Sequence, residues 1–325
     1  MGRYLFFAFI FCLTVTGYSK IWTVDNNVGA TWANFARVDT ALKYANNYDT
    51  VYVMGSTTVY NDITITKPVV IIGPGYFLDQ NAPVPINGGV AAINYITIQR
   101  SDVLIIGMQN YSLSINASTT ISNVNIRRCY IQNSISISNG SNYEITQNYI
   151  GGNISWTYDQ VKNIRISGNR VNNITEDGNQ LLSNGVIISN NIIFGSITTG
   201  CEMIFNNIFM ITSASPVING KNNSASNNMC RGTQLPAGNG NLLNVNLDYD
   251  VYITSTSTDG KYQLAQGSPA IGAGLNGVDM GMYAGAYPYI PSGLPPMPFI
   301  YQLSATPAGT AQSGIPVSFK AKSSR

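Results

Sequence analysis

The charged side chains whose types suit catalysis gather between residues 162 and 177. Lys162, Arg165 and Arg170 precede an adjacent acidic pair, Glu176 and Asp177. Carboxylates near basic groups suit proton transfer, and two neighbouring carboxylates supply part of a Ca²⁺ site. A solvated loop with balanced charges gives the same pattern, and only five acidic residues occur between residues 108 and 228. We therefore keep both interpretations and prefer the solvated loop.

A second group of oxygen-bearing side chains alternates along the chain near residue 247. Asp248 and Asp250 continue the alternation begun by Asn244 and Asn246. Oxygen ligands at every second residue line one face of an extended segment, where they can hold a structural Ca²⁺. An ordinary polar strand edge has the same pattern. The sequence therefore predicts no cofactor and leaves Ca²⁺ open, with Asp248 and Asp250 as its weak candidate ligands.

Aromatic rings and amides supply the chemistry of a sugar-binding surface. The chain has 20 Tyr and 3 Trp. Tyr130 and Tyr149 stand 19 residues apart, and Trp156 and Tyr158 follow them. Planar rings stack on sugars, while amides and hydroxyls bind the hydroxyl groups of sugars. We expect these four residues to bind an extracellular polysaccharide, unless the rings pack against one another instead.

The composition excludes several classes of function. There is no His, which excludes a Ser-His-Asp triad, a Cys-His pair and a His-ligated zinc site. The 17 basic and 15 acidic residues leave a formal charge of +2, too small to favour nucleic acid. Charged residues make up only 10% of the chain, against ~25% in average globular proteins, which excludes a charged helical bundle.

An internal repeat must position all of these residues. The pattern apolar-x-apolar-x-x-Asn recurs along the chain, and its last position is held in turn by Met108, Cys129, Asn148, Asn169, Asn191, Asn207 and Asn228. A period of roughly 20 residues indicates a solenoid. Short strands rich in Ile and Val with Asn corners favour a parallel β-helix over a leucine-rich repeat. We expect Ile and Val to point inward and the Asn amides to bond to one another along the axis.

Three parts of the chain are expected. Residues 1–19 read as a secretory signal, whose apolar run is too short to span a bilayer. Residues 20–290 form the solenoid, closed by an amphipathic helix within residues 33–47 and by a final coil over residues 262–287. Residues 291–325 are expected to form a Pro-rich linker and a hairpin with strands near 299–305 and 315–321, and these strands could equally be the first of a domain absent from this chain. We therefore expect a secreted or cell-surface protein without a membrane span.

Four segments resemble the right-handed parallel β-helix superfamily, often called pectin lyase-like, and together cover about residues 21–290. They are Asn46–Val53, Pro68–Tyr76, the Asn-cornered coils, and Tyr262–Gly274 with Asp279–Gly281. The last segment is similar to the closing segment of many secreted bacterial members without an assigned activity. We therefore expect an all-β, right-handed parallel β-helix solenoid with an N-terminal capping helix and a short C-terminal β-hairpin.

Two functions are compatible with this resemblance. The superfamily includes pectate lyases, polygalacturonases and adhesins, and fold alone does not decide between them. The chain has no adjacent Asp pair and no His, which excludes a polygalacturonase-type site. A pectate-lyase-like site would use Glu176 and Asp177 with Arg165, Arg170 or Lys162, so a polysaccharide lyase acting on uronic-acid glycans is the alternative. We prefer a non-catalytic binding or adhesion protein whose ligand is a polysaccharide.

Overall fold

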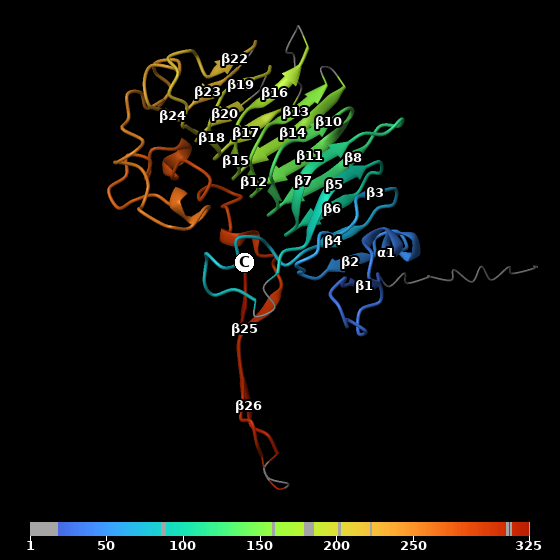
Figure 1. Cartoon of the computed structure of the whole chain (residues 1–325). Coiled ribbons are helices and arrows are strands. Elements are labelled where there is room, and N and C mark those ends of the chain that lie inside the picture. The colour runs from blue at the N-terminus through green and yellow to red at the C-terminus, as the bar shows by residue number, and fades with distance from the viewer. Residues whose placement is uncertain are drawn as a thin grey trace, which may run out of the picture.

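Short strands with alternating apolar side chains stack in register to form a parallel β-solenoid of about 8 turns (Figure 1). The structure is a computed structural model and describes residues 19–85, 89–157, 160–178, 185–200, 203–221, 223–309, 312 and 314–324. The predicted signal, except its last residue, and Tyr158 lie outside the described residues. Within the described residues, no helix has both the length and the apolar character needed to cross a membrane.

Two parallel sheets form the walls of the solenoid. In the described residues, the first sheet has ten strands, whose bounds are β1 (Ile21–Val24), β2 (Thr50–Val53), β4 (Val70–Ile72), β6 (Val103–Ile106), β8 (Ser122–Arg127), β11 (Gly140–Thr146), β14 (Val161–Ser167), β17 (Ile187–Ser189), β20 (Met203–Phe205) and β23 (Ala225–Ser226). The described part of the second sheet has fourteen strands, which are β3 (Ile63–Ile65), β5 (Ala92–Ile98), β7 (Gln109–Ile115), β9 (Tyr130–Ile131), β10 (Ile135–Ile137), β12 (Tyr149–Ile150), β13 (Ile154–Thr157), β15 (Arg170–Val171), β16 (Ile174–Asp177), β18 (Ile192–Ile193), β19 (Ile197–Thr198), β21 (Ile208–Phe209), β22 (Ile218–Asn219) and β24 (Met229–Cys230).

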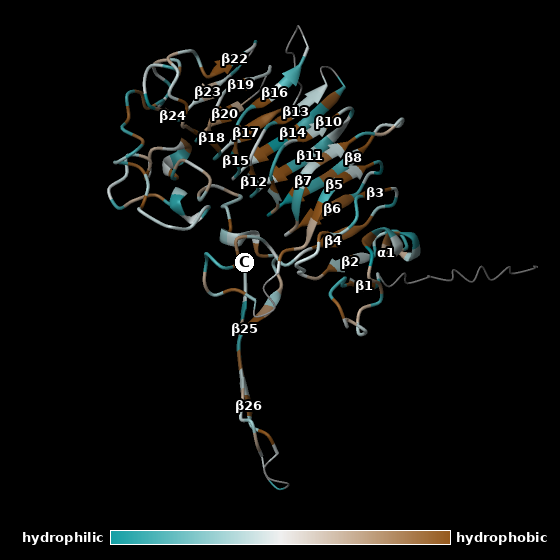
Figure 2. Ribbon diagram, in the orientation of Figure 1, coloured by the Kyte–Doolittle hydropathy of each residue, from teal (hydrophilic) through white to brown (hydrophobic). Residues whose placement is uncertain are grey.

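The core is a stack of Ile and Val side chains from successive coils. Ile145 pairs in parallel with Ile166, which pairs with Ile188, and all three are at most 1% exposed. Figure 2 shows apolar and polar residues mixed along the solenoid strands, as expected when side chains point alternately in and out. The predicted parallel stacking of coils is therefore confirmed.

A ladder of buried asparagines runs along the core, as the sequence predicts. Its five predicted members, all 0% exposed, are Asn148, Asn169, Asn191, Asn207 and Asn228. Each Nδ2 donates to the Oδ1 of the next member at 2.9–3.0 Å. The ladder continues from Asn228 to Asn241 at 3.3 Å. These bonds satisfy amides that would otherwise be costly to bury.

The two predicted end elements are present. Helix α1 (Val38–Tyr44) is shorter than the predicted amphipathic stretch, and it buries Val38 and Ala41 beside the first coil. Strands β25 (Pro298–Ala305) and β26 (Val317–Ser323) pair as an antiparallel hairpin. In Figure 1 this hairpin projects away from the solenoid, starting near the end that carries α1.

The predicted final coil over residues 262–287 is wrong. The fully described stretch between β24 and β25 contains no strand, only turns and three short 3₁₀ segments, η1 (Gly260–Tyr262), η2 (Leu275–Gly277) and η3 (Pro291–Gly293). Part of this stretch, residues 273–294, runs back along the outside of the solenoid, and we call it the strap. Asn227 Nδ2 binds the Ala273 carbonyl at 3.1 Å in a late coil. At the other end, the Tyr76 N–H binds the Ser292 carbonyl at 2.8 Å near the first coils.

The buried carboxylate of Asp259 fixes the end of the strap. Asp259 is 0% exposed, and its oxygens accept hydrogen bonds from Asn81 Nδ2 at 2.7 Å, the Tyr289 hydroxyl at 3.0 Å and the Ser292 N–H at 2.7 Å. Several donors compensate the cost of burying the charge. Residues 291–294, which the sequence assigns to a linker, therefore pack against the body, with Ser292 0% exposed.

Candidate ligand-binding groove

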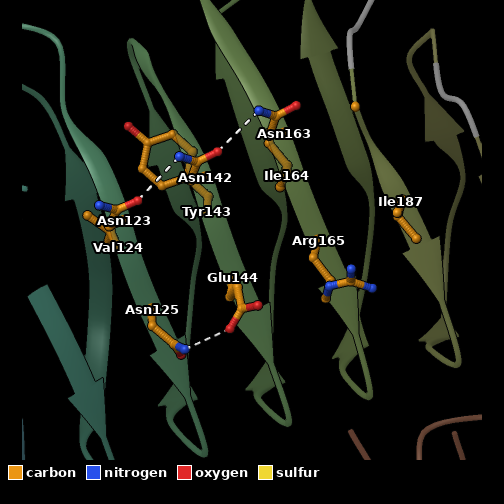
Figure 3. A pocket seen from close by; sticks show the side chains of 11 residues that line it. Asn123, Val124, Asn125, Asn142, Tyr143, Glu144, Asn163, Ile164, Arg165 and Ile187 are labelled. Atoms are coloured by element: carbon orange, nitrogen blue, oxygen red, sulfur yellow. Dashed lines mark hydrogen bonds between the residues drawn. The ribbon is translucent and has the colours of Figure 1, made fainter. Parts of the chain in front are cut away.

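A groove of about 580 Å³ crosses strands β8, β11 and β14 on the outer face of the ten-stranded sheet and ends at β17 (Figure 3). We call it the amide groove. The polar side chains that line it are Asn123, Asn125, Asn142, Glu144, Asn163 and Arg165. Because neighbouring parallel strands lie ~4.8 Å apart, the groove offers one edge asparagine per coil along the axis, while the outward residue on its floor differs from coil to coil.

The upper edge of the amide groove is a second, exposed asparagine ladder. Asn123, Asn142 and Asn163 have φ between 52° and 60°, the left-handed region that Asn tolerates better than most residues. Asn142 Nδ2 donates to Asn123 Oδ1 at 3.3 Å, and Asn163 Nδ2 donates to Asn142 Oδ1 at 3.1 Å (Figure 3). An amide has two N–H donors and two lone pairs, so each keeps hydrogen-bonding capacity for a ligand.

The floor of the amide groove carries opposite charges on neighbouring strands. Glu144 pairs in register with Asn125 on one side and Arg165 on the other. Asn125 Nδ2 donates to Glu144 Oε2 at 2.9 Å. The Tyr287 hydroxyl, which comes from the strap, lies 3.5 Å from Glu144 Oε1, and its ring centroid lies 5.7 Å from Arg165 Cζ. Among the described residues, the Arg165 guanidinium makes no hydrogen bond or ion pair, so it is available to a ligand.

The repeat itself places these side chains. In the pattern apolar-x-apolar, the two apolar residues point into the core and the residue between them points outward. Tyr143 and Ile145 are both 1% exposed, whereas Glu144 between them is half-buried in the groove. The same alternation sets Arg165 between the buried Ile164 and Ile166.

The five charged residues predicted for catalysis do not line one cavity. Of the five, Arg165 alone lines the amide groove. Lys162 is exposed on the same strand, and Asp177 is exposed at the end of β16 in the other sheet. Arg170 lies on β15, where its Nη1 donates to the Ile150 carbonyl at 2.7 Å and its Cζ lies 4.1 Å from the Phe194 ring centroid.

Glu176 is also placed differently from the prediction. It points into the solenoid and is 2% exposed, because it stacks in register on the inward Trp156. Its Oε2 accepts hydrogen bonds from Thr199 Oγ1 at 2.8 Å and from the Gly200 N–H at 3.2 Å. An inward carboxylate with these partners cannot join Asp177 in a surface calcium site, so the predicted acidic pair is separated by the alternation of the strand.

The two tyrosines of the predicted aromatic row lie side by side and are half-buried. Tyr130 and Tyr149 pair in register, and their ring centroids lie 5.6 Å apart. Phe77 packs on both rings at 4.8 and 5.4 Å. Burial raises the pKa of Tyr149 to about 12. Trp156 is 1% exposed and belongs to the core. Tyr130 and Tyr149 are half-buried and pack against each other and Phe77, the arrangement that the sequence leaves open as the alternative to sugar binding.

The alternating oxygen ligands near residue 247 are exposed, but one of them is engaged. Arg231 Nη2 donates to Asp248 Oδ1 at 2.7 Å. This bond holds the pKa of Asp248 below its usual value. Asp250 is exposed. In the part of the chain that the structure describes, no three Asp, Glu, Cys or His side chains come together as metal ligands.

Sequence reasoning missed most of the amide groove. It named Arg165 but not Asn123, Asn142, Asn163 or Tyr287. The signal for the asparagines is their fixed position, one residue before the first apolar residue of the repeat. Tyr287 leaves no such signal, because it reaches Glu144 from a segment more than a hundred residues further along the chain.

Comparison with family models, with curated proteins and with solved structures finds no match for this chain. The fold and the groove therefore define its class on their own. The chain is a parallel β-solenoid protein with a polar, asparagine-edged groove across one sheet.

Proposed function

We propose that this protein binds an extended extracellular polysaccharide in the amide groove and does so without catalysis. The observation that carries the proposal is the row of exposed amides at coil spacing beside the unpaired Arg165 (Figure 3). A polysaccharide lying along the solenoid axis would meet one edge amide at each of the three coils of Asn123, Asn142 and Asn163. Membership of the pectin lyase-like superfamily, secretion and a role in adhesion are part of this proposal.

The chemistry of the groove favours a hydroxyl-rich ligand. Its edge consists of neutral amides, which donate to and accept from sugar hydroxyls. The groove carries one cation and one carboxylate, and that carboxylate already accepts from Asn125. Arg165 therefore supplies the strongest free donor in the groove, since hydrogen bonds from charged groups are about twice as strong as neutral ones.

This proposal is tested by measuring how well a panel of polysaccharides is retained by the wild type and by two variants, each with one substitution in strand β14. Arg165→Ala should weaken retention about 10-fold or more, because it removes a charge-assisted hydrogen bond worth ~1.5–3 kcal/mol. Lys162→Ala removes an exposed cation on the same strand β14 outside the groove and should change retention less than about 2-fold. Affinity electrophoresis or calorimetry with neutral and uronic-acid glycans measures both. Equal effects of the two variants, or no retained glycan, would refute the groove as the site.

The alternative is a polysaccharide lyase acting on uronic-acid glycans. The accessible Arg165 beside Glu144 is the feature that favours it, because elimination needs a base near the sugar. The same panel is therefore assayed for unsaturated products with and without Ca²⁺. Products that disappear in Arg165→Ala would establish the lyase, and retention without products would support binding alone.

A further inference from the structure

The exposed asparagine ladder of the amide groove continues by one more residue, to Asp102. Asn123 Nδ2 donates to Asp102 Oδ1 at 2.9 Å. The φ angles of Asp102, Asn123 and Asn142 are 59°, 58° and 60°, and each residue directly precedes the first apolar residue of the repeat in its coil. Asn142 donates to Asn123 just as Asn123 donates to Asp102, so these hydrogen bonds all point toward the carboxylate. Aligned hydrogen bonds of this kind polarise and strengthen one another.

A polar pocket of about 220 Å³ begins at Asp102, and we call it the corner pocket. Its lining residues stand at the corners that lead into β2, β4, β6 and β8, and its polar side chains include Tyr48, Gln99, Arg100, Asp102, Thr119 and Thr120. In the sheet these strands are followed by β11, β14 and β17, which carry the amide groove from β8 onward. The corner pocket and the amide groove therefore lie one after the other along the axis, joined by the bond between Asn123 and Asp102.

The corner pocket offers a hydrogen-bond acceptor and a hydrogen-bond donor that the described part of the protein leaves unused. Asp102 is exposed, and its Oδ2 accepts no hydrogen bond from a described residue. Arg100 is also exposed and, among the same residues, makes no ion pair or hydrogen bond. A carboxylate only accepts hydrogen bonds and a guanidinium only donates them, whereas a sugar hydroxyl does both. A hydroxyl-rich ring can therefore use both groups, while a small anion or cation would meet a like charge.

We propose that the corner pocket is a second subsite for the polysaccharide of the amide groove, and that it holds a sugar residue through hydroxyl groups bound by Asp102 and Arg100. This inference rests on the proposed function of the groove. At ~4.8 Å per strand, the groove from β8 to β17 covers roughly 14 Å of the axis, whereas the site from β2 to β17 covers roughly 29 Å. A ligand that fills both parts is a longer chain, so the affinity depends on the length of the oligosaccharide.

Calorimetry of the whole chain with oligosaccharides of graded length, prepared by partial hydrolysis of a neutral β-glucan and of a polyuronate, tests this inference. The affinity of the wild type should rise once the oligosaccharide is long enough to extend from the groove to Asp102. Asp102→Gly removes the carboxylate without backbone strain, because Gly readily adopts positive φ. It should weaken the binding of long oligosaccharides about 10-fold, since hydrogen bonds to charged groups are strong, and that of short ones less than about 2-fold.

Two further variants keep the test independent of a single substitution. Arg100→Ala removes the other charged group of the corner pocket and should show the same dependence on length. Asp250→Gly is the control, because it removes an exposed carboxylate that lines neither the corner pocket nor the groove. It should change the affinity for long and short oligosaccharides less than about 2-fold. Thermal unfolding of each variant checks that the solenoid is intact.

Arg165→Ala separates a failure of the subsite from a failure of the groove. This variant should weaken long and short oligosaccharides alike. If it does so while Asp102→Gly and Arg100→Ala bind as the wild type does, the subsite is overturned and the groove stands. Equal weakening of long and short oligosaccharides by Asp102→Gly would mean that the carboxylate acts on the groove through the ladder, which also overturns the subsite. A wild type that binds no oligosaccharide of any length would overturn both proposals.

Discussion

At the scale of single residues, the buried asparagines act as substitutes for main-chain partners. Asn169 Nδ2 donates to the Ile145 carbonyl at 2.8 Å and to the Ser167 carbonyl at 3.1 Å, besides its bond to Asn191. Its Oδ1 accepts from the Asn148 N–H at 2.9 Å. One side chain thus satisfies polar groups of three different coils at this tight corner.

Replacing Asn169 by Ala should be among the most destabilising single changes. It leaves several buried polar groups without partners, so we expect a loss of ~3–5 kcal/mol in the free energy of unfolding, measured in urea. Asn125→Ala is the control, because Asn125 gives up one side-chain bond and its Oδ1 already lacks a partner. We expect ~1 kcal/mol or less for the control. Similar losses in both variants would contradict the ladder as a source of stability.

Cys129 occupies the ladder position of an early coil, where later coils have an asparagine. Its Sγ lies 3.3 Å from the Arg127 carbonyl and 3.8 Å from the Ile105 carbonyl, the acceptors equivalent to those that Asn169 binds. The N–H of Met108 also faces this sulfur. Burial raises the pKa of the thiol to about 12, so the thiol stays protonated. A thiol is a weak donor and a weak acceptor in a position that suits an amide.

Cys129→Asn should therefore extend the ladder by one coil. The new amide can donate to the same carbonyls and to Asn148 Oδ1, while its oxygen accepts from Met108. We expect the free energy of unfolding to rise by about 1 kcal/mol. Cys129→Ser, whose hydroxyl is shorter and reaches fewer partners, is the control and should not stabilise. A destabilised Cys129→Asn would mean that the corner has no room for the amide.

The residue scale also shows where sequence reasoning fails. The pattern identified the buried Asn positions correctly, because period and residue type agree in each coil. The pattern did not predict whether the side chains of Trp156 and Glu176 point into the core or toward solvent. The bend before β13 and before β16 decides which alternate residues of each strand point inward. A shift of one residue exchanges the two faces. Arg165 was placed in a group with residues that the fold sends to a different sheet.

At the scale of elements, a row of left-handed corners guides the strap. The residue before each ladder position has positive φ in every coil from Gly107 to Asn227. Several of these corners bind the strap directly. Asn206 accepts from the Leu275 N–H at 2.7 Å, Gln147 donates to the Pro288 carbonyl at 2.6 Å, and Arg128 donates to the Leu294 carbonyl at 2.8 Å. Long polar side chains are therefore used at corners where backbone geometry alone would favour Gly or Asn.

At the Gly168 corner the strap passes close to the backbone. A Cβ at Gly168, whose φ is +69°, would clash with the Tyr287 carbonyl oxygen. Gly168→Ala should cost ~3 kcal/mol or more, since it adds this clash to the usual ~1 kcal/mol of left-handed strain. Gly267→Ala is a matched control with φ +80° and no atom within 4 Å of the added carbon. It should cost only the strain. Chemical denaturation measures the free energy of unfolding of both variants. Equal losses would mean that the strap moves away from the added carbon at no cost.

The elements that sequence predicts best are those whose signals are local. A few neighbouring residues are enough to predict the alternation of the strands, the helix α1 and the strands of the hairpin. The strap is not, since its hydrogen bonds join residues such as Gln147 and Pro288, and it has no periodicity of its own. An Ala- and Gly-rich stretch with regular apolar residues was therefore interpreted as one more coil.

At the scale of the whole molecule, the strap brings the chain back to the end at which the solenoid begins. A cavity of about 240 Å³ between Tyr52 and Phe299 lies where the hairpin base meets the first coils. The helix α1 and the hairpin therefore occupy the same end (Figure 1). The amide groove lies further along the rod, on β8 to β17, so contacts made by the hairpin leave that sheet face free.

The return of the strap also changes how the solenoid can unfold on heating. In a simple repeat protein each coil contacts only its neighbours, so terminal repeats fray one after another. Here the coil of Asn227 and the coil of Tyr76 are joined through one continuous segment, which crosses the coils between them. Loosening either end requires the release of that segment from the rest. The repeats therefore do not unfold independently, and thermal unfolding at one end of the solenoid destabilises the coils at the other end.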